Sequence, residues 1–436
     1  MPTTAGPDDA RPGAAVGHSV ESIAAIQRRT LILLVSAQVV GGLGIGAAVS
    51  VGAVLALQLS GSDEWSGLAG TMITLGAASL AIPLARLAAR RGRRVSLSAG
   101  WILAAVGAAV AVVSAVTSSF VLFLVGLLLI GSGTATNLQS RYAATDLSPP
   151  SSRARHLSVV VWSTTVGSVL GPNLTGPGEV VGRWLGIPEI AGPFAISTAG
   201  FTAAAIVIAV LLRPDPLLVT LPSNPRNTPV NPAMTQASGS AMRELAHSPA
   251  ALVALSAVVL GHGVMVSVMT MTPVQMTHHG AELKIIGLVI SLHIAGMYAL
   301  SPVFGWLADR LGRRPVIVIG QLLLIMSAVV AGTAGHSTPR LMVGLVLLGL
   351  GWSAGLVAGS TLLAESVTDE HRPAIQGVSD LLMNLVAATG GGLSGVVLGL
   401  QGYGGLNALA VLLVVPTVVL LAIERLRARS SARTQG

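Results

Sequence analysis

The sequence feature that most constrains this chain is a short cluster of charges between two long apolar segments. It spans residues 305–314 and reads Gly-Trp-Leu-Ala-Asp-Arg-Leu-Gly-Arg-Arg. A related segment lies at residues 85–94 and reads Ala-Arg-Leu-Ala-Ala-Arg-Arg-Gly-Arg-Arg. Such clusters are typical of short turns that join two membrane helices at the lipid surface. The two copies, called here the first basic turn (residues 85–94) and the second basic turn (residues 305–314), predict a tandem repeat in a membrane.

The composition agrees with a membrane protein. Hydrophobic residues make up 52% of the 436 residues and charged residues only 10%, whereas a soluble domain carries about 25% charged residues. We therefore expect an all-α membrane protein with about twelve transmembrane helices in two six-helix, pseudo-symmetric bundles, an arrangement found in transporters. The expected spans are residues 31–57, 68–84, 95–116, 120–143, 159–174, 192–212, 250–273, 285–303, 315–334, 341–363, 374–398 and 406–423.

The segments outside the bundles are polar or rich in proline. Residues 213–248 contain two Asn-Pro pairs and are predicted to form a flexible cytoplasmic linker. The linker separates a first bundle at residues 28–212 from a second bundle at residues 249–425. We expect disordered cytoplasmic tails at residues 1–27 and 426–436.

The positions of the basic residues predict the orientation. The net charge is +8, and on the expected topology all basic residues except Arg183, Lys284 and Arg340 fall on one side of the membrane. This asymmetry marks the cytoplasmic side, so both termini are expected in the cytoplasm of a cell whose plasma membrane holds the protein. A charge explained in this way does not indicate nucleic-acid binding.

The second basic turn resembles the signature of the major facilitator superfamily, Gly-x-Leu-Ala-Asp-Arg-x-Gly-Arg-Arg/Lys. The matching residues are Gly305, Leu307, Ala308, Asp309, Arg310, Gly312, Arg313 and Arg314. The first turn keeps Arg86, Arg90, Gly92, Arg93 and Arg94, but it has Ala85 and Ala89 in place of Gly and Asp. The resemblance covers most of the chain and implies a secondary transporter that works by alternating access. It also implies that the two turns control opening and closing.

Residues 167–176 are similar to the Gly-x-x-x-Gly-Pro-x-x-Gly-Gly motif of the drug/proton antiporters in this family. The matching residues are Gly167, Gly171, Pro172 and Gly176, while Thr175 replaces one glycine. This likeness favours export of a small apolar or amphipathic molecule against protons. Glycines at this spacing also serve as ordinary helix-packing positions.

Charged residues inside membrane helices predict the proton-coupling site, since each costs roughly 2.5–3.5 kcal/mol on insertion scales. Asp380 is the main candidate, with Asn384 one turn further along the same helix face. The alternative is a structural role for Asp380 as the partner of Arg86 or Arg90 in the first basic turn, which lacks its own acid.

Four further residues are candidates for proton handling: Arg141, Asp146, His262 and His293. Arg141 and Asp146 would alternatively form a pair at the end of one helix, and the histidines would alternatively be neutral hydrogen-bonding groups. Asp146 and Glu365 are expected to stabilise the basic turns, and each is followed seven residues later by an arginine, Arg153 and Arg372. For the second turn we expect the contacts to remain within the second half, near Glu365.

Polar and aromatic residues within the spans predict a substrate cavity. These are Gln38, Asn137, Gln139, Trp162, Asn173, Met265, Met269 and Asn384. The amides would alternatively form hydrogen bonds between helices. The scarcity of acids among them argues against a strongly cationic substrate. The chain has no cysteine and no repeated spacing of metal ligands, so we expect no metal site.

The energy source is expected to be a proton gradient with no bound cofactor. No Gly-x-x-x-x-Gly-Lys-Ser/Thr loop is present, and Lys284 is the only lysine. The expected partners are the lipid bilayer, protons and a small-molecule substrate, and the protein is expected to be a monomer. The alternatives are an uptake symporter or facilitator for a polar metabolite and, from another class, a membrane enzyme or lipid-handling scaffold. The last would need converging catalytic groups that the sequence does not indicate, so an enzyme is not expected.

Overall fold

The computed structural model describes residues 20–61, 68–220, 233–280 and 283–434. These residues form helices and their connections, with no strand among them. The first half contains α1 (Val20–Ser60), α2 (Leu68–Val116), α3 (Phe120–Ala143), α4 (Arg153–Leu170), η2 (Pro172–Leu174), α5 (Thr175–Leu185), η3 (Glu189–Ala191), α6 (Gly192–Ile206) and η4 (Val207–Leu211). The second half contains α9 (Pro249–His278), α10 (Leu283–Tyr298), α11 (Ser301–Leu311), α12 (Arg313–Gly332), α13 (Thr338–Glu365), α14 (Arg372–Val411), η5 (Leu412–Val414) and α15 (Val415–Thr434).

Nine helical segments of the described chain are long and apolar enough to cross a membrane. Two of these segments turn back at a glycine with positive φ and so contain two spans each. The first turns at Gly92 (φ 85°) within α2, and the second turns at Gly402 (φ 67°) within α14. Together with α4, a further helix of 18 residues, they account for the predicted number of spans.

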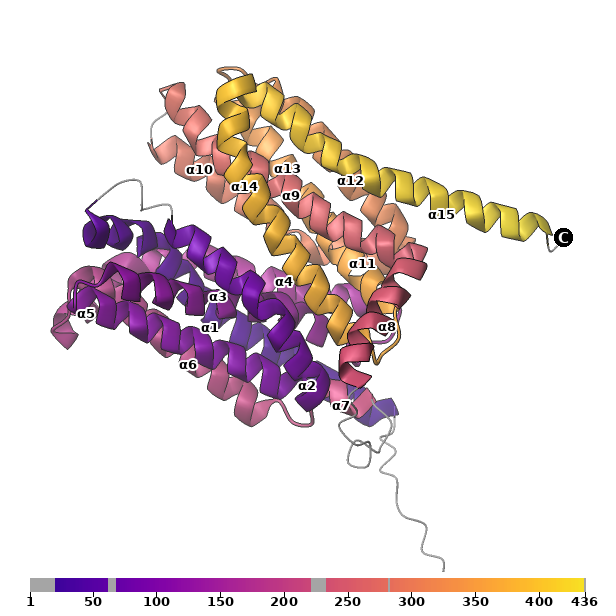
Figure 1. Ribbon diagram of the computed structural model, residues 1–436, viewed down its shortest axis with the longest axis horizontal. Helices are drawn as coiled ribbons and strands as arrows, with labels where there is room; N and C mark the ends of the chain where they lie inside the picture. The colour runs from indigo at the N-terminus through magenta and orange to yellow at the C-terminus, as the bar shows by residue number, and fades with distance from the viewer. Residues whose placement is uncertain (1–19, 62–67, 221–232, 281–282, 435–436) are drawn as a thin grey trace, which may run out of the picture.

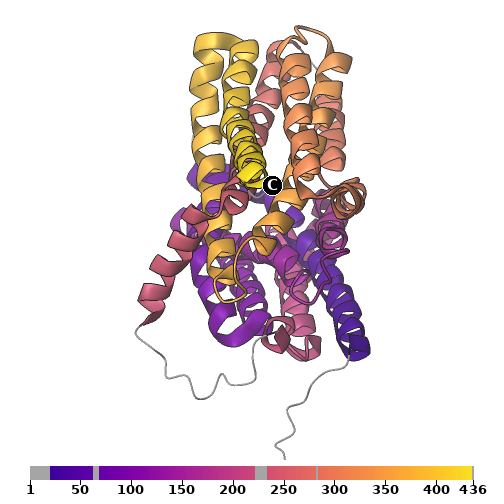
Figure 2. The same cartoon turned by 90° about the vertical axis from the view of Figure 1, so that its right-hand side faces the viewer.

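Each half has its own apolar core. One cluster of buried side chains runs from Leu34 to Leu212 in the first half, and another fills the second half. Ala154, Leu157 and Val161 of α4 belong to the second cluster, because α4 packs against α11 of the other half. In Figure 1 the halves approach each other around α2, α4 and α11, whereas α5 and α10 lie far apart at the other end. Figure 2 shows the two bundles stacked one above the other.

The segment between the halves is more ordered than the sequence indicates. It contains α7 (Pro216–Thr220) and α8 (Ala233–His247), two helices that were not predicted from the sequence. Glu244 of α8 accepts hydrogen bonds from the backbone N–H of Thr368 (2.7 Å) and from its hydroxyl (3.1 Å), and it pairs with His371. These contacts fasten α8 to the second half before α14.

The predicted tails are also partly helical. Helix α1 already begins at Val20, and α15 continues to Thr434 and projects from the bundle in Figure 1. The rest of the predicted N-terminal tail, residues 1–19, lies outside the described residues.

Candidate functional site

The first basic turn is built around a buried arginine. Gly92 reverses the chain, and Arg93 then points inward with 1% of its surface exposed. Its Nε donates to Asp146 Oδ2 (2.8 Å) and its Nη2 donates to Asp146 Oδ1 (3.2 Å). Nη2 also donates to Gln376 Oε1 of α14 (2.7 Å). The predicted contact between Asp146 and this turn is therefore present, and a neutral amide of the other half completes it.

A second acid stabilises the same turn, and the sequence analysis missed it. Asp215, just before α7, accepts hydrogen bonds from the backbone N–H of Arg93 (3.1 Å) and of Arg94 (2.7 Å). A Cβ added to Gly92 would lie 2.3 Å from the Asp215 carboxylate. The carboxylate thus caps the helix that starts after the turn. Asp215 lies between Pro214 and Pro216, in a proline-rich stretch that indicated only a linker. Nothing in the sequence predicted that it would lie beside Gly92.

The acid of the second basic turn reaches across to the first half. Asp309 accepts hydrogen bonds from the backbone N–H of Ala154 (3.0 Å) and of Arg155 (2.9 Å), at the start of α4. It also pairs with Arg313 (3.0 Å). The prediction that this turn makes its contacts only within the second half was wrong, since the exposed N–H groups of the α4 N-terminus lie opposite the carboxylate.

Arg313 forms the contact that was expected within the second half. Its Nε donates to Glu365 Oε2 (3.2 Å) and its Nη2 to Glu365 Oε1 (2.9 Å). Nη2 also donates to the carbonyl oxygen of Pro150 in the first half (2.5 Å). Arg153 lies 3.5 Å from the same Glu365 carboxylate. Glu365 therefore gathers arginines from both halves.

The different leading residues of the two turns have a packing explanation. A Cβ on Gly305 would lie 2.2 Å from Ser158 Oγ of α4, so the second turn needs glycine there. At the equivalent place in the first turn, Ala85 faces Gly377 of α14, where an added Cβ would lie 2.4 Å from the Ala85 Cβ. In the first turn the glycine of this contact is therefore Gly377 of α14 and not residue 85. This explains why the first turn has Ala85 where the family signature has glycine.

A second deeply buried ion pair joins the two halves. Arg141 Nη2 of α3 donates to Asp380 Oδ1 of α14 at 2.6 Å, and the two side chains are 2% and 0% exposed. Nη2 also donates to the Tyr142 hydroxyl (3.1 Å). The expected partners of these residues were therefore wrong: Asp380 pairs with neither Arg86 nor Arg90, and Arg141 does not pair with Asp146. The docking of α3 against α14 brings together residues that are 239 positions apart.

Aromatic residues of the second half lie close to this pair. Trp352 Nε1 of α13 donates to His262 Nδ1 of α9 (2.8 Å). Tyr298 of α10 packs edge-on against Trp352, with ring centroids 5.5 Å apart. The charge of Arg141 acts on both His262 and Tyr298. The sequence analysis singled out His262 but missed Tyr298 and Trp352, which show no signal apart from their side-chain type.

Several predicted residues are engaged inside one half. Gln139 donates to the carbonyl oxygen of Ala81 (3.1 Å) and is 2% exposed, and Met265 belongs to the core of the second half. His293 Nδ1 lies 2.8 Å from the carbonyl oxygen of Leu345, so this buried histidine contacts its own half.

The remaining predicted cavity residues do not form one site. Gln38 is buried and its amide contacts the Asn137 carbonyl oxygen (3.5 Å), whereas Asn173 is exposed in η2. Asn384 donates to the carbonyl oxygen of Asp380 (2.8 Å) and so lies beside the ion pair. Trp162 is 41% exposed and Met269 is partly buried against the second core.

The glycines of the antiporter-like motif serve helix packing. A Cβ on Gly167 would lie 2.4 Å from the Gly42 backbone, and one on Gly171 would lie 2.5 Å from the Gly46 backbone. These positions let α4 approach α1 closely. Gly176 has no such neighbour.

The other arginines of the basic turns are peripheral. Arg86, Arg90 and Arg310 are exposed, and within the described residues no ion pair involves Arg86 or Arg90. Arg310 lies over the Trp306 ring (5.2 Å), and Arg314 pairs with Glu424 within the second half (2.6 Å).

Arg372, which lies outside the basic turns, is buried and donates to the carbonyl oxygen of Ala364 (2.8 Å).

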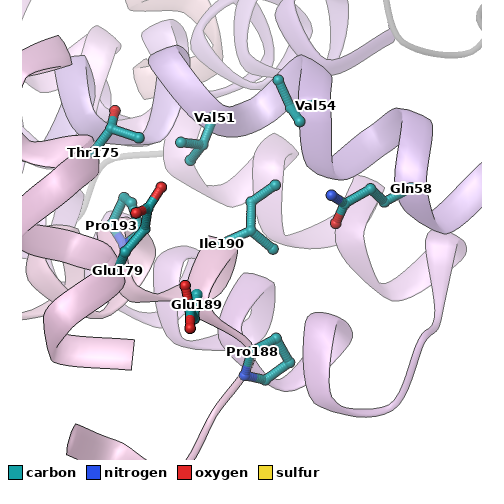
Figure 3. Close-up of a pocket in the computed structure, with 9 residues that line it drawn as sticks. All are labelled: Val51, Val54, Gln58, Thr175, Glu179, Pro188, Glu189, Ile190 and Pro193. Carbon is teal, nitrogen blue, oxygen red and sulfur yellow. The ribbon is translucent and has the colours of Figure 1, made fainter. Parts of the chain in front are cut away.

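Two cavities lie away from the ion pair between the halves. One of about 740 Å³ lies beside the start of α1 and the α3–α4 loop and includes Asp146, Arg153 and Arg372. The other, of about 490 Å³, belongs to the outer part of the first half and is lined by Glu179 and Glu189 among apolar residues of α1 and α6 (Figure 3). Glu189 pairs with Arg183 (3.1 Å). None of the residues predicted for a substrate cavity lines either of them.

Comparison with known proteins decides the family. The model of the Major Facilitator Superfamily matches residues 31–282 and 266–435. The chain belongs to the major facilitator superfamily. As a member of this superfamily it is a multi-pass membrane transporter and not an enzyme, as the sequence predicted.

The relatives and solved structures align with this chain over nearly its whole length. YdeG, an uncharacterized MFS-type transporter of Bacillus subtilis (strain 168), is 38% identical over 405 residues, which are 92% of this chain and 94% of the relative. The riboflavin transporter RfnT of Brucella anthropi is 26% identical over 93% of this chain and 98% of its own length. Among solved structures, the human organic anion transporter MFSD10 superposes with a TM-score of 0.71 at 17% identity, covering 91% of this chain and 99% of that one. The transporter FucP in the outward conformation superposes with a TM-score of 0.68 at 17% identity, covering 90% and 98%. At this identity the structures show a shared fold.

Proposed function

We propose that this superfamily member is a proton-coupled secondary transporter of the plasma membrane and that Asp380 is the group that carries the proton. The observation that supports it most is the ion pair between Arg141 and Asp380, which joins the halves where both side chains are shielded from solvent. Protonation of Asp380 would remove the negative charge and weaken this link between the halves. A proton would thereby favour separation of the halves on the side of the basic turns.

The conformation of the protein fits such a cycle. Every inter-half hydrogen bond described above lies at or near the basic turns, and the charge asymmetry of the sequence makes this the cytoplasmic side. The protein is then closed toward the cytoplasm. Asp309 at the start of α4, the Arg313–Glu365 pair and the Arg93–Gln376 contact hold this side closed.

The direction of transport depends on how the substrate and the proton interact at the pair. Export against protons requires that the substrate and the proton compete. Uptake with protons requires that they bind together. The packing of Gly167 and Gly171 against α1 gives these glycines a structural role, so they no longer argue for export.

The test uses the purified protein in proteoliposomes. A thermal-shift panel that includes riboflavin, aromatic acids, sugars and drugs identifies a substrate, and transport of this substrate is then measured with and without an imposed pH gradient. We expect the gradient to drive accumulation in the wild type. Asp380→Asn should keep substrate exchange between equal concentrations but lose the response to the gradient. An unchanged response in this variant would remove Asp380 from the coupling mechanism.

A further inference from the structure

The ion pair between the halves leaves strong hydrogen-bonding groups without partners. Arg141 uses only Nη2 for its bonds to Asp380 and Tyr142, and within the described residues its Nε and Nη1 have no hydrogen-bond partner. Asp380 binds through Oδ1 only, and its Oδ2 has no partner there either. Guanidinium groups donate in a planar fork that matches a carboxylate. Both two-donor edges of Arg141 share Nη2, which Asp380 and Tyr142 occupy, and one donor on each edge, Nε and Nη1, stays free for a carboxylate oxygen in a site that excludes bulk water.

The neighbouring side chains add a further donor and aromatic surfaces. His262 Nδ1 accepts the hydrogen bond from Trp352 Nε1, so the proton of the neutral ring is assigned to Nε2, which becomes a donor. His262 and Tyr298 are only partly buried. Tyr298 of α10 provides an apolar ring, which packs edge-on against the buried Trp352 of α13. The site thus combines donors for an anion with surfaces for a ring.

The geometry points to a binding site for an organic monocarboxylate with a flat apolar body, held by Arg141 and His262 beside Trp352 and Tyr298, that is loaded together with a proton on Asp380. This inference rests on the proposed function and names its substrate class. The proton binds to the free Oδ2 of Asp380, and the carboxylate of the ligand takes over the charge of Arg141. One proton and one anion enter together, so the net charge of the site does not change.

The groups around Asp380 favour this exchange. The charged and titratable groups that act on it are Arg141 and Tyr142 from α3 and Arg93 from α2, while α9 brings His262 close to Arg141. Arg93 is already paired with Asp146. A neutral Asp380 would therefore leave Arg141 as the buried cation that lacks a counter-charge, and such a charge is strongly unfavourable unless an anion binds.

The test compares three ligands of similar shape and different charge on the purified full-length protein. Phenylacetate, phenylacetamide and phenethylammonium are titrated by calorimetry at pH 6 and pH 8, and a pH-indicator dye follows protons in weakly buffered solution. We expect phenylacetate to bind with uptake of about one proton and to weaken by up to roughly tenfold per pH unit. The amide and the ammonium compound should not bind at this site.

Variants separate the roles of the two residues. Asp380→Asn should bind phenylacetate with the same affinity at pH 6 and pH 8 and without proton uptake, because its side chain is already neutral. Arg141→Gln should lose binding, and His262→Gln, which leaves the ion pair in place, should weaken it several-fold. Arg340→Gln serves as the control, because Arg340 is exposed and bonds to Thr333 elsewhere in the second half.

Four results would overturn the inference. The first is that phenylacetate fails to bind at pH 6. The second is that the amide binds as tightly as the carboxylate. The third is that the carboxylate releases protons instead of taking them up, which would leave proton coupling through Asp380 intact. Carboxylate binding that moves no proton would overturn joint loading and the proposed function together.

Discussion

Two buried ion pairs near the basic turns are chemically alike but differ in how completely they are bonded. Arg93 contacts both oxygens of Asp146 within the first half, and Gln376 adds a further bond. Arg141 contacts one oxygen of Asp380 across the halves and keeps Nε and Nη1 without partners. The bonds between Arg93 and Asp146 lie within one half, so they can persist when the halves separate and the contact with Gln376 breaks. A partly bonded pair can exchange its partner for a proton and a ligand.

The largest effect on stability is expected when the acid is removed from the Arg93–Asp146 pair. Asp146→Ala leaves Arg93 buried without a counter-charge, which should lower the free energy of unfolding by about 3–5 kcal/mol. Thermal unfolding of the detergent-solubilised protein measures this, with Glu189→Ala at the exposed pair with Arg183 as the control. An unchanged melting temperature would show that the Arg93–Asp146 pair is not a structural support.

The partly bonded pair should respond differently to the loss of its charge. Asp380→Asn keeps a side-chain oxygen near Arg141, so we expect a small change in melting temperature and a large change in conformation. The population open on the side of the basic turns should rise and should no longer depend on pH. Hydrogen exchange of residues 152–158 and 368–376 reports on that side. If exchange there stayed at the wild-type level, Asp380 would not control the closed state.

The two basic turns also differ in how they connect the halves. Asp309 caps α4 of the other half with two backbone hydrogen bonds, whereas Asp215 caps the turn of its own half. Loss of a cap costs about 1 kcal/mol, so Asp309→Ala should shift the equilibrium toward opening by roughly fivefold to tenfold. Asp215→Ala should instead destabilise the first half without favouring the open state. Equal hydrogen exchange at the start of α4 in both variants would contradict this distinction.

The packing of Gly377 against Ala85 can be tested with a compensating double substitution. Gly377→Ala introduces a methyl group against Ala85, and such overpacking costs about 1–3 kcal/mol. The double variant Gly377→Ala with Ala85→Gly restores the space and should recover most of the lost stability in thermal unfolding. If the double variant were less stable than Gly377→Ala, the complementary packing would not explain Ala85.

The smallest effect is expected when low pH weakens the contact of Glu244, which joins α8 to the second half. Burial raises the pKa of Glu244, but hydrogen bonds from Thr368 and His371 outweigh it, and the pKa ends below its usual value. Because the pKa of Glu244 is lower in the folded state, the stabilisation that its carboxylate provides is fully present above the pKa of a glutamate in the unfolded chain, about 4.3. It is lost as the pH falls through the lower value of the folded state. Hydrogen exchange in α8 should therefore increase below about pH 4, and Glu244→Gln should remove most of this pH dependence.

Much of the fold could be predicted because it depends on local patterns. Apolar length determines the spans, and the glycines before Arg93 and Arg313 determine where two helices turn. Asp146 and Glu365 were correctly expected to contact the basic turns. Helix α8 was not predicted within the linker, because the contacts of Glu244 with Thr368 and His371 come from a distant loop that the composition of residues 213–248 does not indicate.

The sequence by itself determined that this protein is a duplicated bundle of membrane helices with charged turns on one side, because hydropathy and charge act through the lipid on each segment separately. The tertiary structure decided which charges meet. Asp380 faces Arg141, Asp309 faces the start of α4, and Asp215 faces the Gly92 turn. These partners depend on how each helix is rotated and on how the two halves dock, and neither is set by local pattern. The candidate binding site is therefore a property of the docked halves.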